Sequence, residues 1–204
     1  MRISLITGCS GFLGSHLLKL LAPQRHCNYT TYYTKPIFAD HAVYLDIRDE
    51  SQVQKVINYI KPHVIIHTAA MTSLDDCFER KKEAWETNVK GTENLVRAAR
   101  QINARFIYLS TDLVFKGDKV NYTEEDTIQP VCYYGETKAL GEKTLENLLS
   151  NYAIIWTSFL FGVALVIVSV IFRRSKNLEA DFGRWNKVFQ RLKNIMAHNV
   201  LQEA

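Results

Sequence analysis

Residues 7–14 read Thr-Gly-Cys-Ser-Gly-Phe-Leu-Gly, and they follow directly on the apolar run at residues 3–6. Glycines at this spacing after a strand build a cradle for a pyrophosphate. Gly8 permits the tight turn, Gly11 lets the backbone approach the anion, and Gly14 lets the next helix pack closely on the sheet. The N-terminus of that helix offers unpaired N–H groups to the anion. The stretch therefore predicts a strand, a dinucleotide-binding loop and a helix.

The composition of the 204-residue chain is that of a globular protein. Hydrophobic residues make up 47% and charged residues 23%, which argues against wholesale disorder and provides for one sizeable core. The cysteines stand far apart and form no Cys-x-x-Cys pair, at Cys9, Cys27, Cys77 and Cys132. Since the first strand begins at once, with no signal peptide before it, we expect reduced thiols in a cytoplasmic protein.

The same residue types give no metal-ligand pattern. His63, His67 and the pair Asp75-Asp76 do not fall at the spacing of a ligand set. We expect a core histidine and a solvated helix start there, and no metal site.

The charge of the chain is concentrated at its end. The formal net charge is +4, and residues 173–204 carry seven basic and three acidic side chains, which accounts for the whole excess. The remaining body is neutral, and a neutral body argues against nucleic-acid binding.

Strand-like and helix-like segments alternate along the first 150 residues. Apolar, β-rich runs lie at 2–7, 29–34, 42–46, 64–68, 105–110 and 153–161, and helical periodicity lies at 12–21, 51–60, 79–102 and 134–149. Asp49 or Ser51 is placed to cap the second of these helices. The alternation predicts an α/β fold, a Rossmann-like doubly wound parallel sheet with helices on both faces.

A tyrosine and a lysine one helical turn apart form a candidate catalytic pair. In Tyr134-Gly135-Glu136-Thr137-Lys138 the first and last side chains face the same side of a helix. A neighbouring ammonium favours a phenolate and is expected to lower the pKa of Tyr134. At the end of the preceding strand, Ser110 or Thr111 is placed to hold a substrate oxygen. Taken alone, these residues favour the other interpretation, a hydroxyl that caps the next turn.

In combination, these motifs resemble the extended short-chain dehydrogenases, and most closely the dTDP-4-dehydrorhamnose reductase family of sugar-nucleotide reductases. The resemblance rests on the glycine loop, on residues 107–117 (Ile-Tyr-Leu-Ser-Thr-Asp-Leu-Val-Phe-Lys-Gly) and on residues 134–142. It covers residues 1–162. Trp156 stands where that family usually has arginine.

The resemblance assigns a role to individual positions. The cofactor-binding positions it implies are Gly8, Gly11, Phe12, Leu13, Gly14, Asp46, Ile47, Ala69, Ala70, Met71, Tyr134 and Lys138. Asp46 would accept from the adenine amino group. The catalytic positions are Thr111, Tyr134 and Lys138, with Tyr134 as the proton donor, and Asn88 would be structural.

The cofactor preference depends on the end of the second strand. NAD enzymes place an acid there to hold the ribose 2′-hydroxyl, whereas this chain has Tyr33-Thr34-Lys35. With no carboxylate to repel a 2′-phosphate, and with Lys35 to attract it, we expect NADP(H) to be favoured over NAD(H).

The resemblance ends after residue 162, and two interpretations of the following sequence remain. Residues 154–172 contain no charge, so they form either the sixth strand followed by a second apolar run, which we favour, or a single membrane helix. Residues 173–204 then form a basic amphipathic tail that would contact a membrane or pack on the sheet. We expect residues 1–162 to be an NAD(P)-binding domain and residues 163–204 a divergent tail in place of most of the substrate lobe.

The first functional expectation is an NAD(P)H-dependent reductase of a nucleotide-linked keto-sugar, with a nucleotide-sugar substrate and no nucleic acid; a homodimer stays open. The alternatives are a sugar-nucleotide epimerase or dehydratase, and a non-catalytic cofactor-binding regulatory subunit or remnant. Leu113 stands where a dehydratase would add a second acid after Asp112, which weakens the dehydratase alternative.

Overall fold

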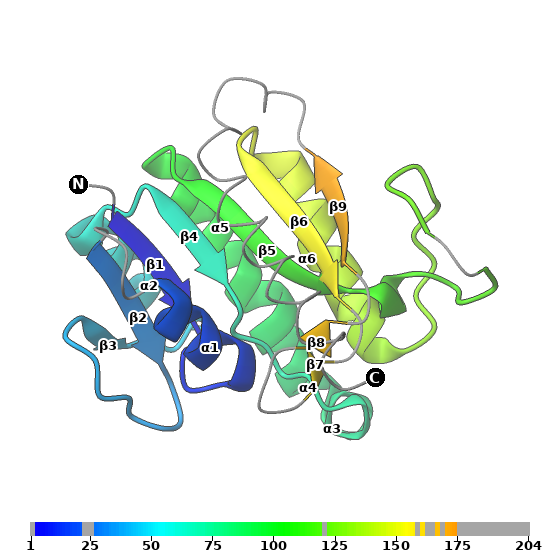
Figure 1. Cartoon of the computed structure of the whole chain (residues 1–204), viewed down its shortest axis with the longest axis horizontal. Coiled ribbons are helices and arrows are strands. Elements are labelled where there is room, and N and C mark those ends of the chain that lie inside the picture. Colours follow the sequence, from blue (N-terminus) through cyan, green and yellow to red (C-terminus); the bar gives the residue numbers. More distant parts are fainter. Residues whose placement is uncertain are drawn as a thin grey trace.

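The computed structural model describes residues 3–21, 27–119, 122–157, 160–161, 166–167 and 170–174. Within these residues, one sheet has the strand order β3-β2-β1-β4-β5-β6-β9 (Figure 1). The first six strands are parallel, and they are β1 (Ile3–Thr7), β2 (Cys27–Tyr32), β3 (Ala42–Tyr44), β4 (Val64–His67), β5 (Arg105–Thr111) and β6 (Tyr152–Thr157). This order confirms the doubly wound, Rossmann-like fold.

The sheet has one further strand. β9 (Val170–Arg174) pairs antiparallel with β6, and β7 (Leu160–Phe161) pairs with β8 (Val166–Ile167) in a separate two-stranded sheet. The predicted strand 153–161 is therefore two elements, because β6 ends at Thr157. The alternative of one membrane helix over 154–172 is wrong, since this segment contains strands. Within the described residues, no helix has both the length and the apolar content to cross a membrane.

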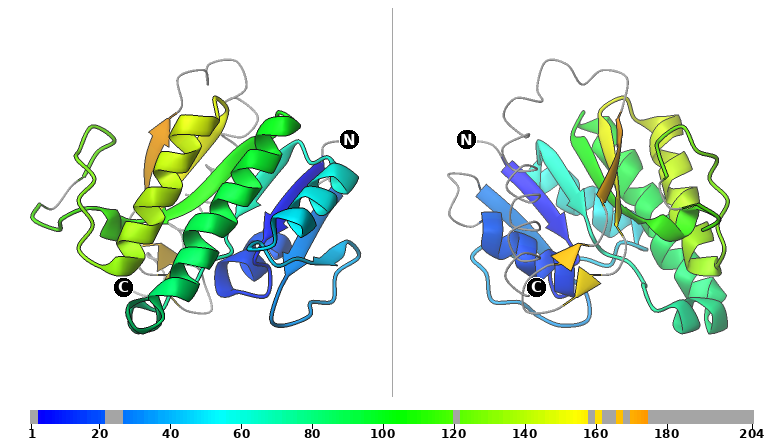
Figure 2. Two further views of the ribbon diagram at one scale, coloured as in Figure 1. Left: turned by 180° about the vertical axis from the view of Figure 1, so that it is seen from behind. Right: turned by 45° about the vertical axis from the view of Figure 1, so that its right-hand side comes forward.

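The helices cover the two faces of the sheet unequally. They are α1 (Phe12–Leu21), α2 (Glu50–Ile60), α3 (Leu74–Glu79), α4 (Lys81–Ala84), the π-helical turn η1 (Trp85–Lys90), α5 (Gly91–Gln101), the 3₁₀ turn η2 (Asp112–Val114) and α6 (Tyr133–Leu148). Among the described elements, α2, α5 and α6 lie behind the sheet and α1 lies in front of it (Figures 1 and 2).

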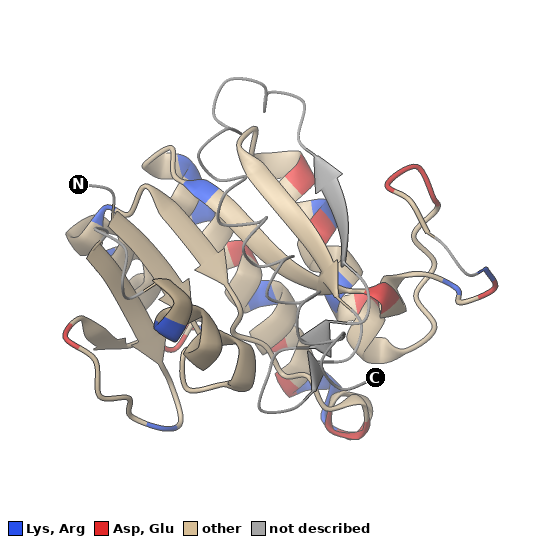
Figure 3. Cartoon of the chain, in the orientation of Figure 1, with Lys and Arg blue, Asp and Glu red and all other residues tan. Residues whose placement is uncertain are grey.

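The core consists of two apolar clusters, one on each face. The larger contains Ile57 of α2, Leu95 of α5 and Leu145 of α6, while the smaller contains Leu17 and Leu21 of α1. The strands β1, β2, β4 and β6 carry no Lys, Arg, Asp or Glu, and the charges lie mainly on helices and connections (Figure 3). Such charge-free strands are expected where helices bury both faces of a parallel sheet.

Local signals fix some helix ends. The Asp49 carboxylate accepts from the backbone N–H of Gln52 at 3.0 Å, so Asp49 rather than Ser51 caps α2. At the other end Lys61 adopts a left-handed conformation, with φ of 48°.

The predicted helix 79–102 is broken. Arg80 separates α3 from α4, and a π-helical turn then joins α4 to α5. The predicted basic amphipathic tail lies outside the described residues, except that residues 173–174 belong to β9. The division into domains at residue 162 stays a prediction, although β9 continues the sheet beyond that point.

Candidate functional site

The glycine loop between β1 and α1 is built around close backbone contacts. Gly8 has φ of 73°, and a Cβ there would lie 2.7 Å from the backbone N of Ala69. A Cβ on Gly14 would lie 2.4 Å from the carbonyl oxygen of Gly8. Larger side chains would therefore push the loop away from α1 and from the end of β4. A tight turn at the start of a helix is typical of anion-binding loops.

A cleft runs along the carboxyl edge of the sheet on both sides of this loop. One half has a volume of about 340 Å³ and the other about 440 Å³, and both are lined by Gly8, Gly11, Thr68 and Ala70. Because the halves share these residues, they form one elongated cleft over the ends of β1, β4 and β5. This is where open α/β sheets bind their ligands.

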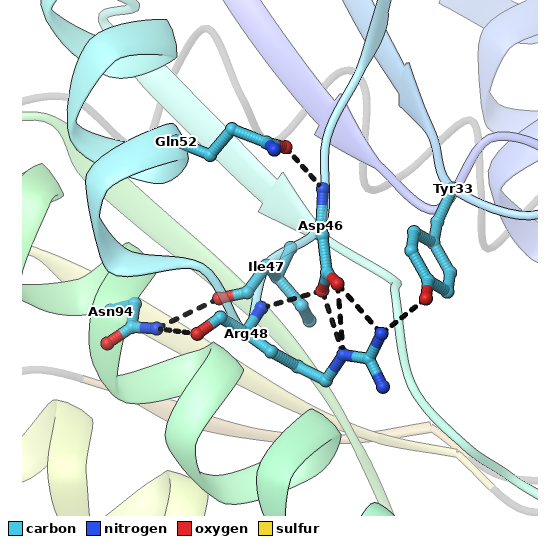
Figure 4. Close-up of polar contacts among 6 residues, drawn as sticks. All are labelled: Tyr33, Asp46, Ile47, Arg48, Gln52 and Asn94. Carbon is cyan, nitrogen blue, oxygen red and sulfur yellow. Dashed lines mark hydrogen bonds and ion pairs between the residues drawn. The ribbon is translucent and has the colours of Figure 1, made fainter.

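The first half of the cleft lies at the ends of β2 and β3. Residues 33–35, which include Lys35, line it together with residues 46–48 and Ala69. Asn94 holds the loop after β3 by donating to the carbonyl oxygens of Ile47 at 3.0 Å and Arg48 at 3.2 Å, and the Gln52 side chain accepts from the backbone of Asp46 at 2.9 Å (Figure 4). The loop is thus fixed before any ligand binds.

Asp46 is not free in this loop, because Arg48 holds its carboxylate. Nη2 of Arg48 lies 2.7 Å from Oδ2, and Nε lies 2.9 Å from Oδ1 (Figure 4). The hydrogen bond to Arg48 holds the pKa of Asp46 below its usual value, and the same contact raises the pKa of Arg48. Arg48 has no signal in the sequence, since it follows the motif residues in an irregular loop.

The second half of the cleft brings together the predicted catalytic residues. Thr111, Tyr134 and Lys138 all line it, together with Phe12, Leu13 and Gly14 at the start of α1. Thr111 also accepts from the backbone N–H of Leu113 at 3.2 Å, so it caps η2 as one alternative anticipated. The hydroxyl of Ser110 instead donates to Glu142. The hydroxyl of Thr111 itself donates to Oδ1 of Asp112 at 3.2 Å, so both hydroxyls have partners in the free chain.

The charge of Lys138 is weakened by its surroundings. The side chain is 3% exposed, and burial lowers its pKa to about 7, while Glu142 opposes this shift. Its Nζ lies 4.0 Å from the centre of the Tyr108 ring.

The expected lowering of the pKa of Tyr134 is not seen. Burial, reinforced by Cys77, Cys132 and Asp112, raises the pKa of Tyr134 in the free chain. The physical reason is the loss of water around the phenol, and Lys138, with a pKa of about 7, is already neutral in the pH range where a phenol ionises.

A buried polar network that the sequence did not predict lies next to the predicted catalytic residues. Glu142 is fully buried and accepts from the indole N–H of Trp156 at 2.8 Å and from Ser110. Glu142 lies one turn beyond Lys138 on α6, and this spacing could have revealed it. The indole therefore supplies a donor at the position where the resembling family usually has arginine.

Met71 and Asn88 form a support for the end of β4. Asn88 accepts from the backbone N–H of Met71 at 2.8 Å, donates to its carbonyl oxygen at 2.9 Å, and also donates to Thr137 at 3.1 Å. These bonds agree with a structural role for Asn88. Met71 itself lines neither half of the cleft, whereas Ala69 and Ala70 do.

His67 is a hydrogen-bonded core residue. Its ring nitrogens lie 2.7 Å from the hydroxyl of Thr7 and 3.0 Å from that of Thr92. Burial lowers its pKa well below the usual value. No cluster of three or more metal-ligating side chains occurs in the part of the chain that the structure describes.

Comparisons with known proteins identify the family. Residues 1–179 match the family model described as "RmlD substrate binding domain". The chain belongs to this family. It is 38% identical over 159 residues to dTDP-4-dehydrorhamnose reductase of Aggregatibacter actinomycetemcomitans, which covers 78% of this chain and 51% of that protein.

The chain is also similar to a solved reductase and to a subunit of another protein. A dTDP-4-dehydrorhamnose reductase from Bacillus anthracis, solved in complex with NADP, superposes with a TM-score of 0.71 at 36% identity, over 79% of this chain and 55% of its own. Methionine adenosyltransferase 2 subunit beta of Xenopus tropicalis is 31% identical over 198 residues, 92% of this chain and 58% of that protein. The chain thus spans between half and three fifths of the length of these relatives.

Proposed function

We propose that this RmlD-family chain binds NADP(H) and reduces the keto group of a nucleotide-linked sugar. One observation carries the proposal: Thr111, Tyr134 and Lys138 line the same cleft as the glycine loop. Gly8 and Gly14 fit a dinucleotide-binding loop, because a Cβ at either position would clash with neighbouring backbone in the tight turn and the close helix packing that such loops require.

The residues have separate tasks in this reaction. A bound nicotinamide supplies the hydride. Tyr134 donates its proton to the carbonyl oxygen, and Thr111 holds that oxygen in place. Lys138, whose pKa is about 7, offers a proton near neutral pH on the same helix face as Tyr134.

The decisive assay is oxidation of NADPH by the full chain with a dTDP-4-keto-6-deoxysugar. We expect oxidation of NADPH that depends on the keto-sugar, because Thr111, Tyr134 and Lys138 line the cleft with the glycine loop. Tyr134→Phe keeps the ring but removes the proton, so it should abolish turnover and leave cofactor affinity within a few-fold. Turnover retained in this variant would remove Tyr134 from the mechanism.

The preference for NADP(H) is tested separately. Lys35 lines the half of the cleft at the end of β2, where a 2′-phosphate would lie. Lys35→Asp should shift the affinity towards NAD(H) in a fluorescence titration, since a carboxylate repels the phosphate and binds a hydroxyl. Equal affinities of the unaltered chain for the two cofactors would refute the preference.

A non-catalytic, cofactor-binding subunit is the second candidate. It is favoured by the similarity to subunit beta, which extends over 92% of the chain and beyond the 78% matched by the reductase. A chain that binds NADPH but shows no Tyr134-dependent turnover with any keto-sugar would decide for this alternative. For either function we propose the cytoplasm as the compartment, supported by four free cysteines.

A further inference from the structure

In the free chain, Arg48 binds both oxygens of Asp46, the carboxylate that is expected to accept from the adenine amino group. Oδ1 of Asp46 accepts from the backbone N–H of Arg48 at 3.0 Å and from Nε at 2.9 Å. Oδ2 accepts from Nε at 3.2 Å and from Nη2 at 2.7 Å. These contacts come from three N–H hydrogens, because Nε has a single hydrogen that both oxygens share, and they cover both oxygens on the side that faces Arg48. An adenine amino group therefore has to displace the Arg48 side chain before it can bond to Asp46.

The guanidinium already lies beside the expected position of a ribose phosphate. Its central carbon lies 4.9 Å from the centre of the Tyr33 ring, and Nη2 donates to the Tyr33 hydroxyl (Figure 4). Tyr33 directly follows β2, and the tip of β2 is where this fold class binds the 2′ position of the adenosine ribose. The Arg48 side chain is 28% exposed, and its bonds to Asp46 and Tyr33 run through Nε and Nη2.

The charges lining this half of the cleft fit an exchange of partners. Among the lining residues, Asp46 is the one acid, and Lys35 and Arg48 are the cations. A 2′-phosphate is an anion that the guanidinium of Arg48 could bind through two N–H groups, as it now binds Asp46. The adenine amino group would then take the place of Arg48 at Asp46.

We propose that Arg48 is a specificity residue with two positions: it blocks Asp46 in the free chain and moves to the 2′-phosphate when NADP(H) binds. This rests on the proposed NADP(H) preference and explains it in part. A ligand without the phosphate breaks the Asp46–Arg48 ion pair and gives Arg48 no new partner. The ion pair therefore selects against NAD(H), in addition to any attraction by Lys35.

Calorimetric titration of the full chain with adenosine 2′,5′-bisphosphate and with 5′-AMP tests this exchange without any turnover. Arg48→Gln should lower the affinity for the bisphosphate by about tenfold or more. The same change should leave the affinity for 5′-AMP unchanged or raise it, because Asp46 is released. Arg97→Gln is the matched control, since Arg97 forms an exposed ion pair with Glu93 on α5 and should change neither affinity.

Two more variants separate the outcomes. Lys35→Gln should weaken bisphosphate binding without any gain for 5′-AMP. Arg48→Lys keeps a cation but cannot bind both carboxylate oxygens, so its affinity for 5′-AMP should rise while its affinity for the bisphosphate stays within about threefold of the unaltered chain. If Arg48→Gln does not fold, Arg48→Lys tests the exchange in its place.

The results distinguish this inference from the proposed function. If the unaltered chain prefers the bisphosphate and Arg48→Gln binds both ligands as before, the role of Arg48 is refuted and the NADP(H) preference stands. A loss of 5′-AMP affinity in Arg48→Gln equal to the loss for the bisphosphate would also overturn the exchange. If the unaltered chain does not prefer the bisphosphate, the preference and the exchange are both overturned.

Discussion

Lys138 should make the stability of the free chain depend on pH in a narrow and identifiable window. Burial lowers the pKa of Lys138 in the folded chain from 10.5 to about 7. Between these two values the unfolded chain holds a proton that the folded chain has released. The free energy of unfolding therefore rises with pH from about 7 towards about 10. Lys138→Met, which keeps the length of the side chain without its charge, should remove this rise.

The size of the effect follows from the shift. One proton difference changes the free energy of unfolding by about 1.4 kcal/mol per pH unit. Because Lys138 is half-protonated near pH 7, the rise between pH 7 and pH 8.5 should be roughly 1.5–2 kcal/mol. His67 and the thiols of Cys9 and Cys77 titrate outside this pH window. Burial lowers the pKa of His67, and it raises the pKa values of Cys9 and Cys77 to about 12 and about 11.

Urea unfolding of the full chain at pH 7.0, 7.5, 8.0 and 8.5 measures the slope. The control is Lys143→Met, which removes an exposed lysine of the same helix and should retain the rise. Glu142→Gln should move the window to lower pH, because Glu142 supports the charged form of Lys138. An equal slope in Lys138→Met and in the unaltered chain would refute the assignment of this titration to Lys138.

Two further changes test the packing of the site. Gly14→Ala places a Cβ against the carbonyl oxygen of Gly8, so it should lower the free energy of unfolding by about 1–3 kcal/mol in a thermal unfolding assay and abolish nucleotide binding. The control Ser15→Ala should lower it by less than about 0.5 kcal/mol. Trp156→Phe removes the indole donor to the buried carboxylate of Glu142 and should lower the free energy of unfolding by about 1–3 kcal/mol. Adding Glu142→Gln should restore part of this stability. An unchanged melting temperature of Trp156→Phe would show that the bond does not stabilise the chain.

Structural elements that depend on neighbouring residues could be predicted from the sequence. The glycines of residues 8–14 fix the turn by their own backbone contacts, so strand, loop and helix could all be predicted. The alternation of apolar runs likewise predicted the six parallel strands in order. β2 begins at Cys27 rather than at residue 29, because its register is set by pairing with β1 at Ile3, which no local pattern records.

Features that depend on distant partners could not be predicted in this way. The break and the π-helical turn within 79–102 accompany the bonds of Asn88 to Met71, 17 residues away. Arg48 matters because it reaches both Asp46 and Tyr33, which come from two separate connections. The raised pKa of Tyr134 reflects how much water the folded chain excludes, and neighbouring residues in the sequence do not determine this.

The π-helical turn makes the length of its segment as important as its side chains. A π-helical turn closes its hydrogen bonds over one more residue than an α-helical turn. Deleting one residue of Trp85–Lys90 other than Asn88 would turn η1 into a regular α-helical turn, and the wide turn that now places Asn88 would be lost. Asn88 would then face away from either Met71 or Thr137, which it now joins. This stretch should therefore tolerate many substitutions between members of the family but no change in its number of residues.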